Sequence, residues 1–141
     1  MNVKIATNDK EIDDAFSVRH EVFVNEQNVP LEEEMDQYDK EATHFVLYDN
    51  GQPIGAGRCR QLEDVLKVER ICVLSSYRKK GCGILLMQQA EEIATKKGIH
   101  KLKLNAQTHA ENFYKKLGYE TVSEDVFMDA GIPHVTMVKH V

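Results

Sequence analysis

The sequence contains few cysteines and no long apolar run. Cys59, Cys72 and Cys82 are an odd number without paired spacing, which argues against both a disulfide framework and a zinc site. No apolar segment approaches the ~20 residues that a membrane-spanning helix needs. Residues Met1–Ile5 lack the apolar core of a signal peptide. We therefore expect a cytoplasmic protein with no metal and no membrane partner.

A broad excess of basic residues is also absent. The formal net charge is −5, and nonspecific nucleic-acid binding needs a large basic surface, so we expect no nucleic-acid partner. The charges are nevertheless unevenly placed. Residues 78–80 are all basic, whereas residues 32–39 carry the carboxylates of Glu32, Glu33, Glu34, Asp36 and Asp39. This separation suits an anionic cofactor at one place and a cationic acceptor at another. The alternative is that the acidic run is a solvated face or a short helix.

Repeats, low-complexity stretches and linkers are absent as well, so the 141 residues are expected to form one domain, residues 1–141. Asn8 and Glu11 have the spacing of a helix capping box, and Asn50-Gly51 supplies the positive φ of a type I′ hairpin turn. Because predicted strands outnumber helices and the two are mixed along the chain, we expect an α/β fold whose sheet carries helices on both faces. Periodicity places strands at residues 2–6, 44–48, 53–60, 66–74, 101–106, 119–122 and 134–139, and helices after Asn8 and at 84–97 and 109–117.

The segment Arg78-Lys79-Lys80-Gly81-Cys82-Gly83 lies between a predicted strand and a predicted helix. The first turn of a helix has backbone N–H groups without intrahelical partners, and the helix dipole adds partial positive charge there. Two glycines allow a ligand to approach the backbone closely. The segment therefore favours binding of a phosphate or pyrophosphate. A basic surface turn before an ordinary helix is the alternative.

Two common phosphate-binding motifs are missing. The pattern G-x-x-x-x-G-K-[ST] of the Walker A loop is absent. No third glycine follows Gly83, as a dinucleotide fingerprint would require. A general nucleotide-binding protein is therefore disfavoured.

The spacing R-x-x-G-x-G in this loop resembles the acetyl-CoA pyrophosphate loop of the GNAT superfamily of N-acetyltransferases. Residues Ala110–Tyr119 are similar to the helix of that family whose tyrosine faces the thioester, and Arg19–Gln27 and Ala130–His134 resemble segments of a small bacterial subgroup. The resemblance covers nearly the whole chain. It implies a GNAT fold with a mixed central sheet and a splayed central strand pair, and acetyl-CoA as the acetyl donor.

The resemblance also implies which residues bind the cofactor. The pyrophosphate would be held by Arg78, Lys79, Lys80, Gly81, Cys82 and Gly83. The backbone of Ile71, Cys72 and Val73 would pair with the pantetheine arm as an added strand does. Where many family members have asparagine seven positions before the tyrosine, this chain has Gln107, with Asn105 two residues earlier. Either amide could bind the cofactor arm, and Phe113 is assigned to the cofactor side as well.

Tyr114 is the candidate general acid. It follows Phe113 in a predicted helix, where adjacent side chains point about 100° apart, so we expect one of the two rings to face a cleft. A phenol is a suitable proton donor to a departing thiolate of similar basicity. The alternative is that Tyr114 only packs in the core.

Glu69 is the candidate general base, because it lies on the strand beside the expected cleft. The alternative is a cross-strand ion pair. Glu26, Asp36 and His134 are lesser candidates, and a chain of water molecules could replace a dedicated base. Cys82 receives no catalytic role, because the GNAT reaction forms no covalent enzyme intermediate.

Arg19, Glu26 and Gln27 are assigned to acceptor binding, because this region closes over the acceptor in the GNAT fold. A cation on the mostly apolar helix face of Arg19 would need a partner. An arginine that extends outward to solvent is the alternative.

The sequence thus predicts an acetyl-CoA-dependent N-acetyltransferase that acts directly on a primary amine of a small molecule or a protein. The alternative is a CoA-binding regulatory module without catalysis, although such a module would not need a phenol at Tyr114. The identity of the amine and the formation of a homodimer stay open.

Overall fold

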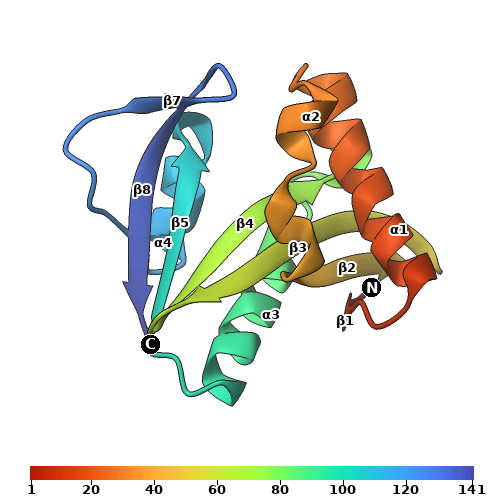
Figure 1. Ribbon diagram of the computed structural model, residues 1–141, viewed down its shortest axis with the longest axis horizontal. Coiled ribbons are helices and arrows are strands. Elements are labelled where there is room, and N and C mark those ends of the chain that lie inside the picture. Colours follow the sequence, from red (N-terminus) through yellow and green to blue (C-terminus); the bar gives the residue numbers. More distant parts are fainter.

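The computed structural model describes all residues from Met1 to Val141 and contains one open, mixed β-sheet with helices on both faces (Figure 1). No helix combines the length and the apolar character needed to cross a membrane. The elements follow in the order β1 (Asn2–Ile5), α1 (Asp9–Arg19), the π-helix η1 (His20–Glu26), α2 (Leu31–Glu34), η2 (Gln37–Lys40), β2 (Thr43–Asp49), β3 (Gln52–Leu62), β4 (Val65–Val73), η3 (Ser75–Tyr77), α3 (Cys82–Lys96), β5 (Lys101–Gln107), η4 (Thr108–Ala110), α4 (Glu111–Lys116), β6 (Glu120–Thr121), β7 (Phe127–Asp129) and β8 (Ile132–His140).

The strands lie in the order β1-β2-β3-β4-β5-β8-β6, and β7 also pairs with β8. All neighbouring strands are antiparallel except β4 and β5. This parallel pair at the centre of the sheet is connected by η3 and α3, as a parallel connection requires a long crossover. The α/β fold expected from the sequence is confirmed.

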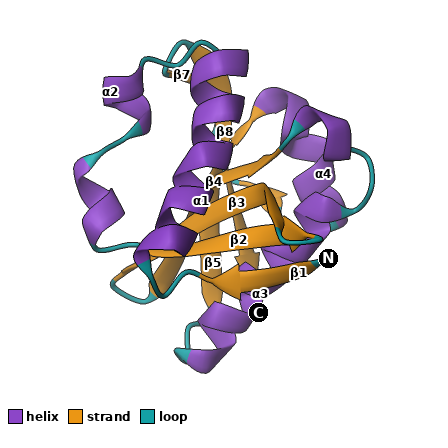
Figure 2. Cartoon of the chain, turned by 90° about the vertical axis from the view of Figure 1, so that its right-hand side faces the viewer, coloured by secondary structure: helices purple, strands orange, loops and turns teal.

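Alternating side chains of β2 divide the core into two layers. Phe45 and Leu47 pack with α3 on one face of the sheet, whereas Val46 and Tyr48 pack with α1 on the other. This alternation is the period of two that a strand buried on both faces must have. Figure 2 shows α1 crossing in front of the strands, with α3 behind and below them.

The central strands β4 and β5 separate after a short paired stretch. They are paired only from Leu66 to Val68 on β4 and from Leu102 to Leu104 on β5, and the two ribbons diverge beyond this point (Figure 1). The splayed strand pair that the family resemblance implied is therefore present. On the side toward β5, the carboxyl-terminal half of β4 therefore has no paired strand, although its other edge pairs with β3.

A β-bulge in β4 accompanies this separation. Arg58 of β3 is opposite Glu69 and Ala56 is opposite Cys72, so two residues of β4 lie opposite Gly57. Arg70, one of these two, has a φ of +59°. A Cβ atom on Gly57 would lie 2.5 Å from the ring of Phe45. Glycine at this position therefore makes room for the Phe45 ring opposite the bulge, and the bulge itself bends and twists β4.

Local sequence signals are mostly confirmed. Asn50 and Gly51 have φ values of +50° and +79° and connect β2 to β3, as a type I′ turn requires. The Asn8 side chain accepts a hydrogen bond from the Glu11 N–H at 2.9 Å. The carboxylate of Glu11, however, accepts from the Thr7 N–H instead of closing the predicted capping box. The three-residue strand β7 was not predicted, because it is too short to show a period.

Candidate functional site

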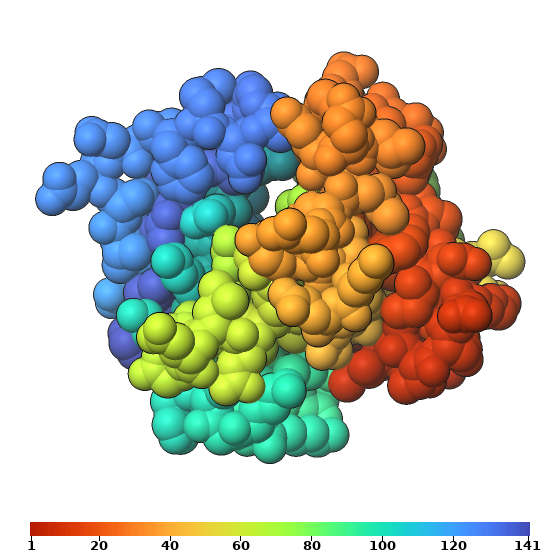
Figure 3. All heavy atoms as spheres, viewed as in Figure 1, coloured from red at the N-terminus to blue at the C-terminus, as the bar shows by residue number.

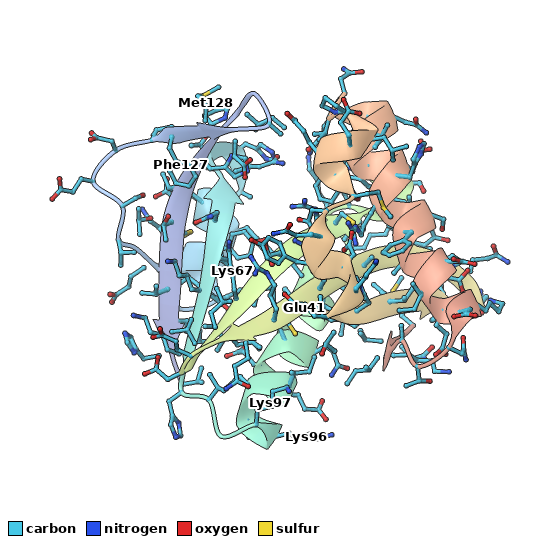
Figure 4. All side chains as sticks on the ribbon, viewed as in Figure 1. Glu41, Lys67, Lys96, Lys97, Phe127 and Met128 are labelled. Atoms are coloured by element: carbon cyan, nitrogen blue, oxygen red, sulfur yellow. The ribbon has the colours of Figure 1, made fainter.

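The separation of β4 and β5 creates a cleft of about 1150 Å³. Its walls come from η1, β4, the loop before α3, β5, α4 and the β7–β8 hairpin. Figure 3 shows its opening as a gap between the α2 region and the β7 region. In Figure 4, Phe127 and Met128 mark β7, which lies across this gap from the α2 region.

The predicted phosphate loop lies at one end of the cleft. Arg78, Lys79, Gly81, Cys82 and Gly83 line the cleft, and α3 begins at Cys82. The 15-residue helix therefore directs its free N–H groups and its positive dipole end to this place. Lys80, which was also predicted to bind the pyrophosphate, does not line the cleft.

Glycine is favoured at positions 81 and 83 of the loop for two different structural reasons. Gly81 has a φ of +80°, and no atom lies within 4 Å of the position that a Cβ would take, so its space is open to a ligand. A Cβ on Gly83 would lie 2.9 Å from Cζ of Phe113. The close approach of the Phe113 ring therefore requires glycine at position 83.

The predicted pantetheine-binding residues Ile71, Cys72 and Val73 line the cleft on the part of β4 that has no partner on the β5 side. The carbonyl of Val73 accepts a hydrogen bond from Nε of Arg78 at 3.0 Å, which connects the strand to the loop. Burial raises the pKa of the Cys72 thiol to about 12. This thiol therefore stays protonated and is not a nucleophile at neutral pH.

Tyr114 and Phe113 both line the cleft. Their rings contact edge to face with centroids 5.0 Å apart, and Tyr114 contacts Tyr119 in the same way at 5.8 Å. Burial raises the pKa of Tyr114 above that of an ordinary tyrosine, so the phenol is neutral and carries its proton at neutral pH. The hydroxyl of Tyr119 is sealed in the protein without a hydrogen-bond partner, whereas that of Tyr114 is not sealed.

Glu69 lies at the start of the separation and lines the cleft. Its carboxylate accepts hydrogen bonds from Arg60 at 2.6 Å and Arg58 at 3.2 Å, and Nζ of Lys67 lies 3.6 Å away. Burial by itself would raise the pKa of Glu69, but these cations outweigh burial and lower it. Glu69 thus has the cross-strand ion pairs that were the alternative to its role as a base.

Arg19 does not line the cleft. Its guanidinium is fully buried and donates to Glu34 at 2.7 and 2.8 Å and to Asp39 at 2.8 Å. The partner that a cation on this helix face needs is therefore within the protein, and Arg19 does not extend outward to solvent. The predicted contact between Arg19 and an acceptor has no support in this arrangement, because the guanidinium is fully buried and lies outside the cleft lining.

The acidic run is divided between buried and exposed positions. Glu34 pairs with Arg19, while Asp36 and Asp39 pair with Arg58 at 2.7 Å. Glu32 and Glu33 are exposed. The run is therefore divided between two roles. Its first part forms the short helix α2 with solvated Glu32 and Glu33, in line with the alternative reading, and its buried carboxylates are counter-ions for buried arginines.

Glu26 and Gln27, which were predicted to bind the amine acceptor, connect the two walls of the cleft. Glu26, at the end of η1, pairs with Arg78 at 2.5 and 2.6 Å, and this pairing lowers the pKa of Glu26. The adjacent Gln27 exchanges amide hydrogen bonds with Gln107 of β5 at 2.9 and 3.3 Å. The end of η1 therefore contacts both the loop after β4 and the end of β5. The structure brings the predicted acceptor and cofactor residues together here.

Asn105 lines the cleft from β5, and its Oδ1 accepts a hydrogen bond from the Thr136 hydroxyl at 2.9 Å. This leaves the amide N–H groups of Asn105 available to a ligand.

His134, a lesser candidate from the sequence, also lines the cleft. It is only 8% exposed, and its Nδ1 lies 2.7 Å from the carbonyl oxygen of Ile132. Asp129 of β7 lines the same wall and was missed, because β7 gave no sequence signal. No group of three or more His, Cys, Asp or Glu side chains is placed to hold a metal ion.

Comparisons with known proteins agree with this geometry. A family model described as "Acetyltransferase (GNAT) domain" matches residues 5–141. A protein of Bacillus subtilis (strain 168) named "Uncharacterized N-acetyltransferase YjcF" is 51% identical over 139 residues, which cover 99% of each chain. The crystal structure of an acyl-CoA N-acyltransferase from Pseudomonas aeruginosa has a TM-score of 0.87 at 26% identity, with 99% of both chains covered. The structure of an aminoglycoside 6′-N-acetyltransferase complexed with coenzyme A has a TM-score of 0.78 at 17% identity, covering 99% of this chain and 97% of the other.

Proposed function

This chain belongs to the GNAT acetyltransferase family, and we propose that it transfers an acetyl group from acetyl-CoA directly to a primary amine. The observation that carries the proposal is the cleft between β4 and β5, which has a basic helix-start loop at one end and a protonated tyrosine in its wall. An anionic thioester cofactor fits this combination of charge and proton donor.

The cofactor would lie along the unpaired half of β4. The pyrophosphate would contact the free N–H groups at the start of α3, beside Gly81 and the cations of Arg78 and Lys79. The pantetheine arm would pair with the backbone of Ile71–Val73, because these residues have no neighbouring strand on the β5 side. Asn105 and Gln107 would face the arm from the other side of the cleft.

Tyr114 would supply the proton to the leaving thiolate. The amine nitrogen attacks the thioester carbonyl carbon, the C–S bond breaks, and the phenol O–H protonates the sulfur. A neutral phenol is needed for this step, and the raised pKa of Tyr114 keeps it neutral. Phe113 fixes the ring by its edge-to-face contact.

Glu69 is the base predicted from the sequence, and in that role it would act through water. Its lowered pKa makes it a weak proton acceptor, and its ion pairs with Arg58 and Arg60 restrict its movement. Glu26 and Gln27 would contact the amine acceptor from η1, which borders the same cleft.

Release of free thiol from acetyl-CoA, measured across a panel of small and peptide amines, tests the proposed function. We expect at least one amine to accelerate release and to yield its N-acetyl product by mass spectrometry. Acetyl-CoA at about 100 times its Kd should stabilise the folded protein by about 2.7 kcal/mol. ATP and NAD at equal concentration should stabilise it less, because neither has a pantetheine arm. Binding of acetyl-CoA without acetylation of any amine would instead indicate a CoA-binding module.

A further inference from the structure

We propose that His134 is the catalytic proton acceptor for the attacking amine, an assignment that rests on the acetyl transfer proposed above. His134 would take a proton from the substrate ammonium and leave the neutral amine that attacks the thioester. The assignment depends on the position of the imidazole, on its fixed tautomer and on the absence of a competing partner at one ring nitrogen.

The surroundings of the ring determine its tautomer. Nδ1 of His134 lies 2.7 Å from the carbonyl oxygen of Ile132. A carbonyl oxygen only accepts hydrogen bonds, so Nδ1 carries the hydrogen in this contact. In the neutral ring, Nε2 then has a lone pair and is the atom that can accept a proton.

Nε2 is open to the cleft. It makes no hydrogen bond within the protein, and it is not among the sealed, unpaired side-chain atoms, which are Nδ1 of His44, Nε of Arg58 and the hydroxyl of Tyr119. Because His134 is 8% exposed and lines the cleft, we place the accessible part of its ring in the cleft.

The ring is also held in place. It stacks on Phe127 with an interplanar angle of 22° and centroids 6.0 Å apart, and Phe127 is opposite His134 in the β7–β8 register. On the other side, His134 is opposite Gln107 of β5. The short strand β7 therefore places an aromatic support against the imidazole, and Asp129 of the same strand lines the cleft nearby.

The contrast with Glu69 decides between the two candidates. Three cations surround the Glu69 carboxylate, and protonation would leave them without their counter-charge. His134 makes no ion pair. Its Nδ1–H donates to a backbone carbonyl, and the lone pair of its Nε2 has no hydrogen-bond partner in the protein. The imidazole therefore loses no existing contact when it accepts a proton.

The step balances as follows. Nε2 removes one proton from R–NH3⁺ and later releases it to solvent. The nitrogen lone pair forms the C–N bond, and the electrons of the C–S bond leave with the sulfur. Tyr114 protonates the thiolate, and the resulting phenolate recovers a proton from the nitrogen that was acylated. The products are the amide, CoA thiol and one proton.

His134→Asn tests the assignment, because the asparagine amide can replace the Nδ1–H donor to Ile132 while Nε2 is removed. At saturating acetyl-CoA, and with an amine accepted by the wild type, the single-turnover rate should fall by about 10²–10⁴-fold. Acetyl-CoA binding and the thermal midpoint should change little. His140→Asn, the same substitution on the exposed end of the same strand, should keep the wild-type rate. Glu69→Gln should lose less activity than His134→Asn.

Two further measurements separate catalysis from folding. Added imidazole should restore activity to His134→Ala in a concentration-dependent way and should not accelerate the wild type. Long-range ¹H–¹⁵N spectra of the wild type should show the Nδ1–H tautomer for His134. An Nε2–H tautomer, or a His134→Asn variant that folds and reacts at the wild-type rate, would overturn the assignment. A wild type that binds acetyl-CoA and acetylates no amine would overturn both this assignment and the proposed function.

Discussion

Tyr114 and Tyr119 are both buried and contact each other edge to face, yet only Tyr114 lines the cleft. The hydroxyl of Tyr119 is sealed without a hydrogen-bond partner, a costly arrangement for a polar atom. The two residues therefore form a natural pair for comparison, because the same Tyr-to-Phe change removes an accessible hydroxyl from one and a sealed hydroxyl from the other.

Tyr114→Phe should lower kcat at least tenfold, within the range of about 10²–10⁴-fold for general acid catalysis. The affinity for acetyl-CoA should change little, because the hydroxyl acts mainly when the thiolate leaves. Tyr119→Phe should keep kcat and should not lower stability. Steady-state kinetics at saturating acetyl-CoA would measure both. If Tyr114→Phe kept full activity under conditions where the chemical step limits turnover, Tyr114 would only pack in the core and would not be the acid.

At the scale of elements, the start of α3 and the short helix α4 meet where Gly83 faces Phe113. The Phe113 ring also contacts the ring of Tyr114, the proposed acid, edge to face. The sequence pattern suggested that Gly83 leaves room for a ligand, and the structure adds that it leaves room for an aromatic ring. A substitution at Gly83 consequently affects both helices.

Gly83→Ala should destabilise the protein, because the added Cβ overlaps Phe113 and such overpacking costs about 1–3 kcal/mol. This clash should outweigh the ~1 kcal/mol by which alanine is favoured over glycine in a helix. Phe113→Leu in the same chain should recover part of the loss, since a smaller side chain makes room. Urea unfolding of the two single variants and the double variant would give the coupling free energy.

Gly81→Ala provides the control for this double-mutant comparison of Gly83 and Phe113. Gly81 has open space around it and a φ of +80°, so alanine there should cost about 1–2 kcal/mol of backbone strain. Phe113→Leu should not recover that loss. Equal recovery for both glycine variants would show that the Gly83–Phe113 contact is not the cause.

At the scale of the whole molecule, one ion network joins segments that are distant in the sequence. Arg19 of α1 and Arg58 of β3 both bind Asp39 of η2, at 2.8 and 2.7 Å. Burial alone would raise the pKa of Asp39, but hydrogen bonds from these arginines outweigh burial and lower it to about 2. The pKa of Asp36 is lowered as well, because the pairing with Arg58 outweighs its burial. The network therefore fixes η2 against the sheet only while its carboxylates are charged.

Stability should consequently decrease in acid. A carboxyl whose folded-state pKa lies below its unfolded value of about 3.9 binds more protons when unfolded, so its stabilisation is complete above pH ~4 and is lost as the pH falls toward 2. Asp39 alone should contribute about 2 kcal/mol. Urea unfolding at pH 6, 4 and 3 should show a falling free energy of unfolding. A constant or rising value over this interval would contradict the role of the network.

Much of the fold follows from the sequence because its signals are local. Asn50-Gly51 fixes the β2–β3 turn through its own backbone preferences, and the pattern from residue 84 to residue 97 predicts α3 nearly to its ends. The basic loop with its two glycines, which we propose to hold the pyrophosphate, is a local signal for the same reason. Such features depend on residues that are neighbours in the chain.

Only the tertiary structure decided what distant residues do to one another. Arg19 was assigned to an acceptor, but Glu34 and Asp39, 15 and 20 residues away, bind it in the interior. Glu69 was assigned as a base, but the register of β3 beside β4 brings Arg58 and Arg60 to its carboxylate. The open Nε2 of His134 depends on a cleft whose walls are formed by strands paired across the sheet. Charge, burial and access at these residues are set by long-range contacts, and no local pattern in the chain encodes them.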